Sequence, residues 1–223
     1  MKYLFPALLT LILQASNCIA MTAAPETYDY LRIPYPLEKQ HTIQEPSIAP
    51  SKITITATKG SDLFTNADNS YQIDNAPRLL FAPKTDFIFS AKVSVDLEKN
   101  FDGAALIVYA DEGNWAKLLL ERFNSGKNGI ASTVVYKGGD DAYHVETQRE
   151  YSHLKIARKG TTYFFYHSED SRHWSYLRSF SLQTSKPTRI GFLAQSPTGP
   201  KVQALFSDIN FEEKTITDYM QGT

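Results

Sequence analysis

The fold is decided by residues 103–123, which read GAALIVYADEGNWAKLLLERF. Residues 114–123 taken alone fit a helix as well as a strand. Their neighbours favour a strand, because the apolar, β-branched residues 103–111 end in the turn sequence DEGN, and a second turn, NSGKNG, follows. The whole stretch is therefore predicted to be a β-hairpin.

The two faces of this hairpin differ in chemistry, because successive side chains of a strand point to opposite faces of a sheet. One face of the second strand carries only alanine and leucine and is predicted to face the core. The other carries a stacking surface, a cation and an anion in Trp115, Lys117 and Glu121. On the partner strand, Tyr109 and Asp111 share one face, and the hairpin could place them near Trp115 and Lys117. This face is either solvated or a binding surface.

The rest of the chain continues the pattern of short, alternating strands. Further segments of this kind are residues 52–60, 86–97, 131–141, 153–160, 162–170, 174–182, 189–197 and 202–211. Each is bounded by Gly, Asp, Asn, Ser or Pro, and none has convincing helical periodicity. We predict an all-β, antiparallel two-sheet jelly-roll sandwich over residues 51–213, with a tail (residues 214–223) that is a short helix or frayed.

The N-terminal residues read as a targeting segment. Lys2 precedes the apolar run of residues 4–13, and small residues lead to Ala20, the expected last residue before cleavage. Residues 1–20 are predicted to be a signal peptide of a secreted or periplasmic protein, with an uncleaved anchor as the alternative. The single cysteine, Cys18, lies in this segment, so disulfides and thiolate catalysis are not expected after cleavage.

Residues 21–50 form a Pro-rich, extended segment. Its prolines forbid a long helix and discourage central strands. The segment is either a linker or an extension that lies along the domain. Its many large apolar side chains favour the second interpretation, because a free linker rarely carries them.

Composition narrows the possible partners. The chain has 223 residues, of which 42% are hydrophobic and 21% charged, as in soluble globular proteins. The net charge is −1, so no basic field points to nucleic acid or to an acidic membrane surface. After residue 20, no segment is apolar enough to predict a membrane span.

Residues 60–211 resemble, in order, a domain-of-unknown-function family with the concanavalin A-like lectin/glucanase fold, which includes fungal regulation-of-enolase proteins. The matching segments are SDLFTN, NAPRLLF, DFIFSAKVSVD, FDGAALIVYADEGNWAKLLLE, STVVYKGGDD, LKIARKG, FFYHSEDSRHWSYLRSFSL and GFLAQSPTG. The resemblance implies a two-sheet jelly roll with one concave face. It implies little about activity, because a fold does not supply a function.

The resemblance also marks motif positions in this chain. They are Asp102, Trp115, Lys117, Glu121, Asp140, Asp141, Arg158, Trp174, Gln195, Ser196 and Pro197. Many family members carry a cysteine soon after the paired aspartates. Here Ala142 and Tyr143 follow instead, so a thiol-dependent role is not expected.

Catalytic and metal motifs are weak in this sequence. The glucanases of this superfamily use Glu-x-Asp-x-x-Glu on one strand, and this chain contains no Glu-x-Asp. Asp140 and Asp141 lie in the Gly-rich segment KGGDDAYH, which is interpreted as a polar turn or as a cation or sugar-hydroxyl site. The five histidines lack zinc spacing, and no phosphate-binding glycine loop is present, so no metal or cofactor is expected.

The leading expectation is a non-catalytic, carbohydrate-binding domain that uses the concave sheet face. Trp115 would stack on a sugar, and Lys117, Glu121 and Arg158 would bond its hydroxyls. The flanking residues would be Tyr109, Asp111 and Gln195. The first alternative is a glycan hydrolase or lyase with a carboxylate pair assembled from distant strands. The second is a protein-interaction or structural domain without a small ligand.

Overall fold

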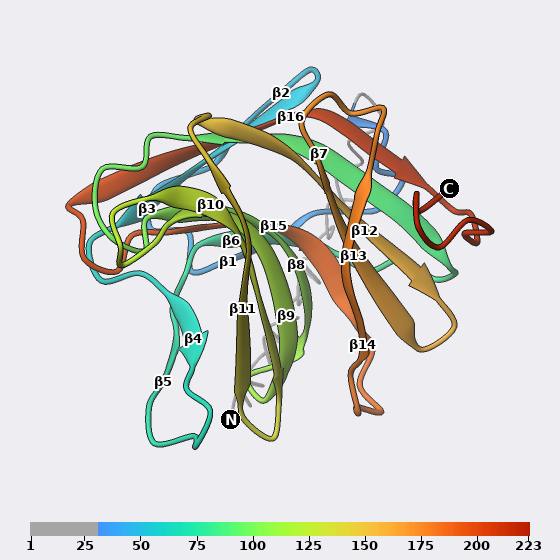
Figure 1. Cartoon of the computed structure of the whole chain (residues 1–223), viewed down its shortest axis with the longest axis horizontal. Coiled ribbons are helices and arrows are strands. Elements are labelled where there is room, and N and C mark those ends of the chain that lie inside the picture. The colour runs from blue at the N-terminus through green and yellow to red at the C-terminus, as the bar shows by residue number, and fades with distance from the viewer. Residues whose placement is uncertain (1–30) are drawn as a thin grey trace, which may run out of the picture.

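The computed structural model describes residues 31–223 and shows an all-β fold (Figure 1). Two seven-stranded sheets pack face to face, and a two-stranded hairpin stands beside the first of them. The predicted two-sheet jelly-roll sandwich is confirmed. Within residues 31–223, no helix has the length and apolar character needed to cross a membrane.

The strands of each sheet pair antiparallel to their neighbours. The first sheet has the order β1 (Glu38–Gln40), β6 (Arg78–Phe81), β15 (Arg189–Gln195), β8 (Gly103–Asp111), β9 (Asn114–Arg122), β10 (Asn128–Tyr136) and β11 (Gly139–Thr147). The second has the order β14 (Ser175–Ser181), β13 (Thr162–Ser168), β12 (Tyr151–Lys159), β7 (Phe87–Val95), β16 (Lys201–Glu212), β3 (Lys52–Thr58) and β2 (Ser47–Ala49). The small hairpin consists of β4 (Leu63–Thr65) and β5 (Gln72–Asp74).

The core between the sheets uses the faces that the alternation predicted. In β9, Ala116, Leu118 and Leu120 are fully buried and share one cluster with side chains of the second sheet such as Phe89 and Ile156. The opening hairpin is present as predicted, since β8 pairs antiparallel with β9. Burial of this apolar face explains why residues 114–122 form a strand although they could form a helix.

The outer face of the first sheet, which points away from the second sheet, is partly covered. Trp115 packs there in a second buried cluster with Ile107 and with Leu63 of the small hairpin. The hairpin also contacts β11, because the backbone N–H of Gly139 donates to the carbonyl oxygen of Asn66 at 3.1 Å. Figure 1 shows the hairpin beside β11, next to the curved strands of this sheet. The hairpin covers only part of this sheet face, and the remaining part is open to a pocket.

The described part of the Pro-rich segment lies along the domain. Leu31 and Ile33 are buried in the main core. Two short strands of this segment join the sheets, β1 pairing with β6 and β2 pairing with β3. The predicted signal peptide, including its cleavage position at Ala20, lies outside the described residues.

The C-terminal tail is neither helical nor frayed. It runs over the outer face of the second sheet, where Ile216 is fully buried. Lys155 of β12 donates to the carbonyl oxygens of Gln221 at 3.0 Å and Gly222 at 3.1 Å. Trp174 is partly buried beside this tail, with its ring centre 4.0 Å from the ammonium of Lys155.

Candidate functional site

A pocket of about 210 Å³ opens on the outer face of the first sheet, beside the small hairpin. We call it the carboxylate pocket, because Asp62, Glu121 and Asp141 all line it. Its other lining residues are Phe64, Phe101, Lys117, Leu119, Ala131, Ser132, Thr133, Tyr143 and Gln195. The residues come from β4, β9, β10, β11, β15 and two loops, so only the folded sheet brings them together.

A chain of hydrogen bonds connects three of the predicted site residues at the pocket wall. The ammonium of Lys117 donates to the side-chain oxygen of Gln195 at 2.8 Å and to the carbonyl oxygen of Leu63 at 2.6 Å. The amide nitrogen of Gln195 donates to Glu121 Oε1 at 3.1 Å and to the carbonyl oxygen of Phe101 at 3.0 Å. All three side chains are buried, so this network holds a cation and an anion inside the sheet face.

Burial and neighbouring charges shift the pKa values of two pocket carboxyl groups. Burial raises the pKa of Glu121 to about 7; the charge of Lys117 opposes this shift, and those of Asp62 and Asp141 add to it. Burial also raises the pKa of Asp62, again opposed by Lys117 and reinforced by Asp141. At neutral pH, Glu121 is therefore present in both its protonated and its ionised form.

Each pocket carboxyl group keeps one oxygen without a hydrogen-bond partner among residues 31–223. Glu121 uses Oε1 for Gln195, Asp62 uses Oδ1 for the backbone N–H of Leu63, and Asp141 uses Oδ1 for the hydroxyl of Thr133. Glu121 Oε2, Asp62 Oδ2 and Asp141 Oδ2 remain. These oxygens can accept hydrogen bonds from a ligand's hydroxyl or ammonium groups.

The pocket also has an aromatic rim. Tyr143 of β11 is 57% exposed and stacks on Phe123, with ring centres 4.3 Å apart. Phe64 of β4 and Phe101 of the loop before β8 also line the pocket. An exposed tyrosine held by a second ring offers a preformed stacking surface.

Trp115 does not provide that surface. Its side chain is 0% exposed, and its indole N–H donates to the carbonyl oxygen of Glu112 at 3.2 Å. The expectation that Trp115 stacks on a ligand is therefore wrong, because the small hairpin covers the part of the face where it lies.

Arg158 lies away from the pocket. It belongs to β12 of the second sheet, and its Nε donates to the carbonyl oxygen of Gly160 at 2.8 Å. Its predicted place beside Lys117 and Glu121 is wrong, since strand alternation alone does not say which sheet a strand joins.

Tyr109 and Asp111 line a different, larger pocket of about 660 Å³. Tyr109 donates to Asp74 Oδ2 at 2.7 Å beneath the guanidinium of Arg78, which lies 4.2 Å from the ring centre. Burial raises the pKa of this tyrosine. Asp111 pairs with Lys186 at 3.0 Å. Tyr109 is opposite Trp115 in the hairpin register, as predicted. Tyr109 and Asp111 do not line the carboxylate pocket.

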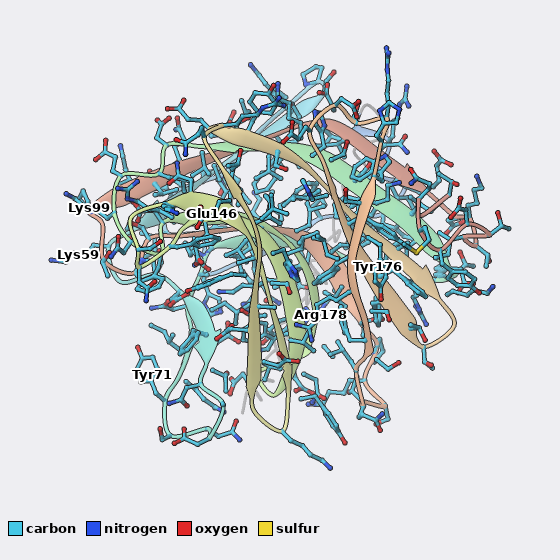
Figure 2. The ribbon with its side chains drawn as sticks, viewed as in Figure 1. Lys59, Tyr71, Lys99, Glu146, Tyr176 and Arg178 are labelled. Atoms are coloured by element: carbon cyan, nitrogen blue, oxygen red, sulfur yellow. The ribbon has the colours of Figure 1, made fainter. Side chains whose placement is uncertain are left out.

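Asp140 and Asp141 are strand residues, because β11 begins at Gly139. The interpretation of this pair as a turn is therefore wrong. Asp141 points into the carboxylate pocket, whereas Asp140 pairs with Arg178 of β14 at 2.6 Å. Figure 2 labels Arg178, which reaches from the edge strand of the second sheet towards β11. The side chains of Asp140 and Asp141 thus point to opposite faces of β11, and only Asp141 belongs to the site.

Asp102 and Ser196, two other motif positions, form a buried structural contact. Ser196 Oγ donates to Asp102 Oδ1 at 2.9 Å, and the backbone N–H of Lys99 donates to Asp102 Oδ2 at 2.9 Å. Both side chains are 0% exposed. This pair holds the loop before β8 against the loop after β15.

Sequence reasoning missed eight of the twelve pocket residues, among them Asp62, Phe64, Thr133 and Tyr143. Tyr143 follows Asp141 by two residues, so strand spacing could have placed both on one face. Asp62 and Thr133 carry no such signal, because they reach the pocket through the hairpin and the β9–β10 register. Within residues 31–223, no group of three or more His, Cys, Asp or Glu side chains is placed to hold a metal ion.

Comparison with known proteins identifies relatives of the whole domain. Residues 41–214 match the DUF1349 family, described as a protein of unknown function. No curated protein matches the chain. A functionally unknown protein from Saccharomyces cerevisiae has a similar structure, with a TM-score of 0.74 and 18% identity over 80% of this chain and 96% of that one.

Two Bacillus enzymes share the fold over part of their length. The GH43 protein BlXynB from Bacillus licheniformis has a TM-score of 0.58 and 15% identity, over 74% of this chain and 34% of that one. A xylan β-1,4-xylosidase from Bacillus halodurans has a TM-score of 0.57 and 13% identity, over 93% of this chain and 41% of that one. The chain thus spans less than half of either enzyme, and the likeness shows a shared concanavalin A-like fold.

Proposed function

The chain belongs to the DUF1349 family, whose function is unknown, and on that premise we propose that its carboxylate pocket binds a carbohydrate without reacting with it. The observation that carries the proposal is that one pocket combines carboxyl oxygens without a hydrogen-bond partner among residues 31–223 with an exposed tyrosine, Tyr143, whose ring stacks on Phe123. Sugar rings offer hydroxyl donors at their edges and apolar C–H faces, and this pocket matches both.

The binding residues differ from those first expected. Glu121, Asp141 and Asp62 would accept hydrogen bonds from hydroxyl groups, and Tyr143 would stack on the ring in place of Trp115. Lys117 and Gln195 would act indirectly by holding Glu121 in position. The volume of about 210 Å³ is below the roughly 300–1,000 Å³ of drug-sized ligand pockets. The pocket is therefore suited to a single ring, such as the end of a glycan chain.

The N-terminal sequence supports an extracellular or periplasmic setting for this binding. Residues 1–20 have the charged start, apolar run and small-residue end of a signal peptide. We propose that they direct export, which would bring the domain to glycans outside the cytoplasm. N-terminal sequencing of the exported protein should then start at Met21, and a chain that stays cytoplasmic with its leader intact would refute this part.

A glycan array tests the binding proposal. The protein should bind a defined set of glycans, and both Asp141→Asn and Tyr143→Ala should weaken that binding. Asp140→Asn is the matched control, because it makes the same chemical change on the adjacent residue that pairs with Arg178. Absence of binding by the unmodified, folded protein would refute the proposal, as would equal loss in the Asp140 variant.

Catalysis is the second candidate, and the raised pKa of Glu121 is the observation in its favour. A carboxyl group with a pKa of about 7 can donate a proton at neutral pH, and a second carboxylate could activate water or attack the sugar. Glycans that bind on the array should then be cut into shorter products, and Glu121→Gln should abolish the cutting. Bound glycans that remain intact after long incubation would leave binding as the function.

A further inference from the structure

We propose that the sugar bound in the carboxylate pocket carries a free amino group, which enters as an ammonium ion. This inference rests on the proposed carbohydrate binding and names its ligand class. The pocket's lining contains three carboxyl groups and one ammonium group, so ionisation of all three carboxyl groups leaves an excess of negative charge in the pocket. A ligand that supplies a positive charge would balance this excess.

The single cation of the pocket, Lys117, is already bonded to other groups of the protein. Lys117 donates two short hydrogen bonds, to Leu63 and Gln195, and its ammonium lies 3.7 Å from Asp62 Oδ1. An ammonium group has three hydrogens to donate, and these two hydrogen bonds use two of them, while the contact with Asp62 is an ion pair without a hydrogen bond. Lys117 therefore has at most one hydrogen left for an acidic sugar, whose carboxylate would also meet three carboxyl groups in the pocket.

Glu121 provides one of the free acceptor oxygens of the pocket. Its side chain is more than nine-tenths buried and lines the cavity, and its Oε2 has no hydrogen bond from residues 31–223. A buried charge without sufficient compensation is costly. Asp62 and Asp141 raise that cost by adding negative charge from two other elements. An ammonium ion between these groups would relieve the repulsion.

The aromatic rim favours the same ligand class. Tyr143 and Phe64 line the pocket, and aromatic faces attract ammonium ions as well as the apolar faces of sugars. A neutral sugar would satisfy the acceptors through its hydroxyl groups but would leave the excess negative charge in place. An amino sugar would satisfy both requirements with one ring.

Calorimetric titration with four matched sets of β-1,4-linked oligosaccharides tests the inference. The probes are oligomers of glucosamine, N-acetylglucosamine, glucose and glucuronic acid, each titrated into the full protein at pH 7. The glucosamine oligomers should bind at least ten-fold more tightly than the two neutral sets, and the glucuronic acid oligomers should not bind. Added salt should weaken binding of glucosamine oligomers more than that of neutral ones.

Charge-matched variants separate a local contact from an overall charge effect. Glu121→Gln and Asp141→Asn should reduce the preference for glucosamine over N-acetylglucosamine towards one. Asp140→Asn removes the same charge from the chain outside the pocket and should keep the preference. Equal loss in the Asp140 variant would overturn the inference, because the preference would then reflect net charge alone.

The outcomes distinguish the inference from the function on which it rests. Equal binding of neutral and amino oligosaccharides would overturn the amino-sugar inference and leave carbohydrate binding intact. Absence of binding by any oligosaccharide would overturn both. Equally tight binding of spermidine, an amine without a sugar ring, would also overturn the inference, because the pocket would then recognise the ammonium group alone.

Discussion

Gln195 and Glu121 form a hydrogen bond of 3.1 Å although a whole strand, β8, lies between them. The residue of β8 that is opposite both of them in the register is Gly103. Because glycine has no side chain, the two long side chains can meet above it. A Cβ atom at Gly103 would lie 3.5 Å from Gln195 Cγ and 3.2 Å from the carbonyl oxygen of Leu120.

Gly103→Val should break this bond. The added branches would occupy the space in which Gln195 and Glu121 meet, and overpacking of this kind costs about 1–3 kcal/mol. Urea unfolding should show this loss of stability. Gly113→Val is the control, since a Cβ there meets only Asp111 Oδ1 at 3.7 Å. An equally stable Gly103 variant would show that the bond does not depend on the missing side chain.

Glu121→Gln should change how stability depends on pH. The pKa of Glu121 is about 7 in the folded protein and about 4.5 in an unfolded chain. Between these values the unfolded state has lost its proton while the folded state keeps it, so the free energy of unfolding falls as pH rises. The contribution is complete below about pH 4.5 and is lost above pH 7, with an upper size of about 3 kcal/mol.

The measurement compares urea unfolding of the native protein and the Glu121→Gln variant at pH 5 and pH 8. The variant should gain stability relative to the native protein at pH 8, because its amide does not ionise. A difference between the two proteins that stays constant from pH 5 to pH 8 would contradict a raised pKa for Glu121.

Lys117→Met should strongly destabilise the domain. It would leave the oxygens of Leu63 and Gln195 without their donor and remove the buried positive charge beside Glu121 and Asp62. Removing one partner of a buried ion pair costs about 3–5 kcal/mol. Lys127→Met is the control, because the pair of Lys127 with Glu146 is exposed and worth about 0–1 kcal/mol. Similar unfolding midpoints for both variants would contradict the structural role of Lys117.

Gly139→Ala should displace the small hairpin from β11. A Cβ atom at this position would lie 1.8 Å from the carbonyl oxygen of Thr65, so the hairpin backbone would have to move. Phe64 of the same hairpin lines the carboxylate pocket, and glycan affinity should therefore fall together with stability. Both are measured, by calorimetry and urea unfolding, with Gly113→Ala as the control. Unchanged affinity would show that the hairpin does not shape the binding site.

The site was predicted only in part, for reasons that its residues make clear. Lys117 and Glu121 share one strand face, so strand alternation alone groups them. Their contact with Gln195 depends on β15 lying two strands away and on Gly103 between them, which no local pattern encodes. Trp115 has the same alternation as Lys117, but the returning hairpin buries it.

The sequence by itself determined that the chain forms short, two-faced strands, because the extended backbone sends alternate side chains to opposite sides. It also determined which face of β9 enters the core, because that face is wholly apolar and gains from leaving water. Only the tertiary structure decided which strands became neighbours, and so which charges share a pocket. Strand order, register and the return of the hairpin arise from contacts between residues far apart in the chain. Those contacts joined Asp62, Glu121 and Asp141 and left Arg158 on the other sheet.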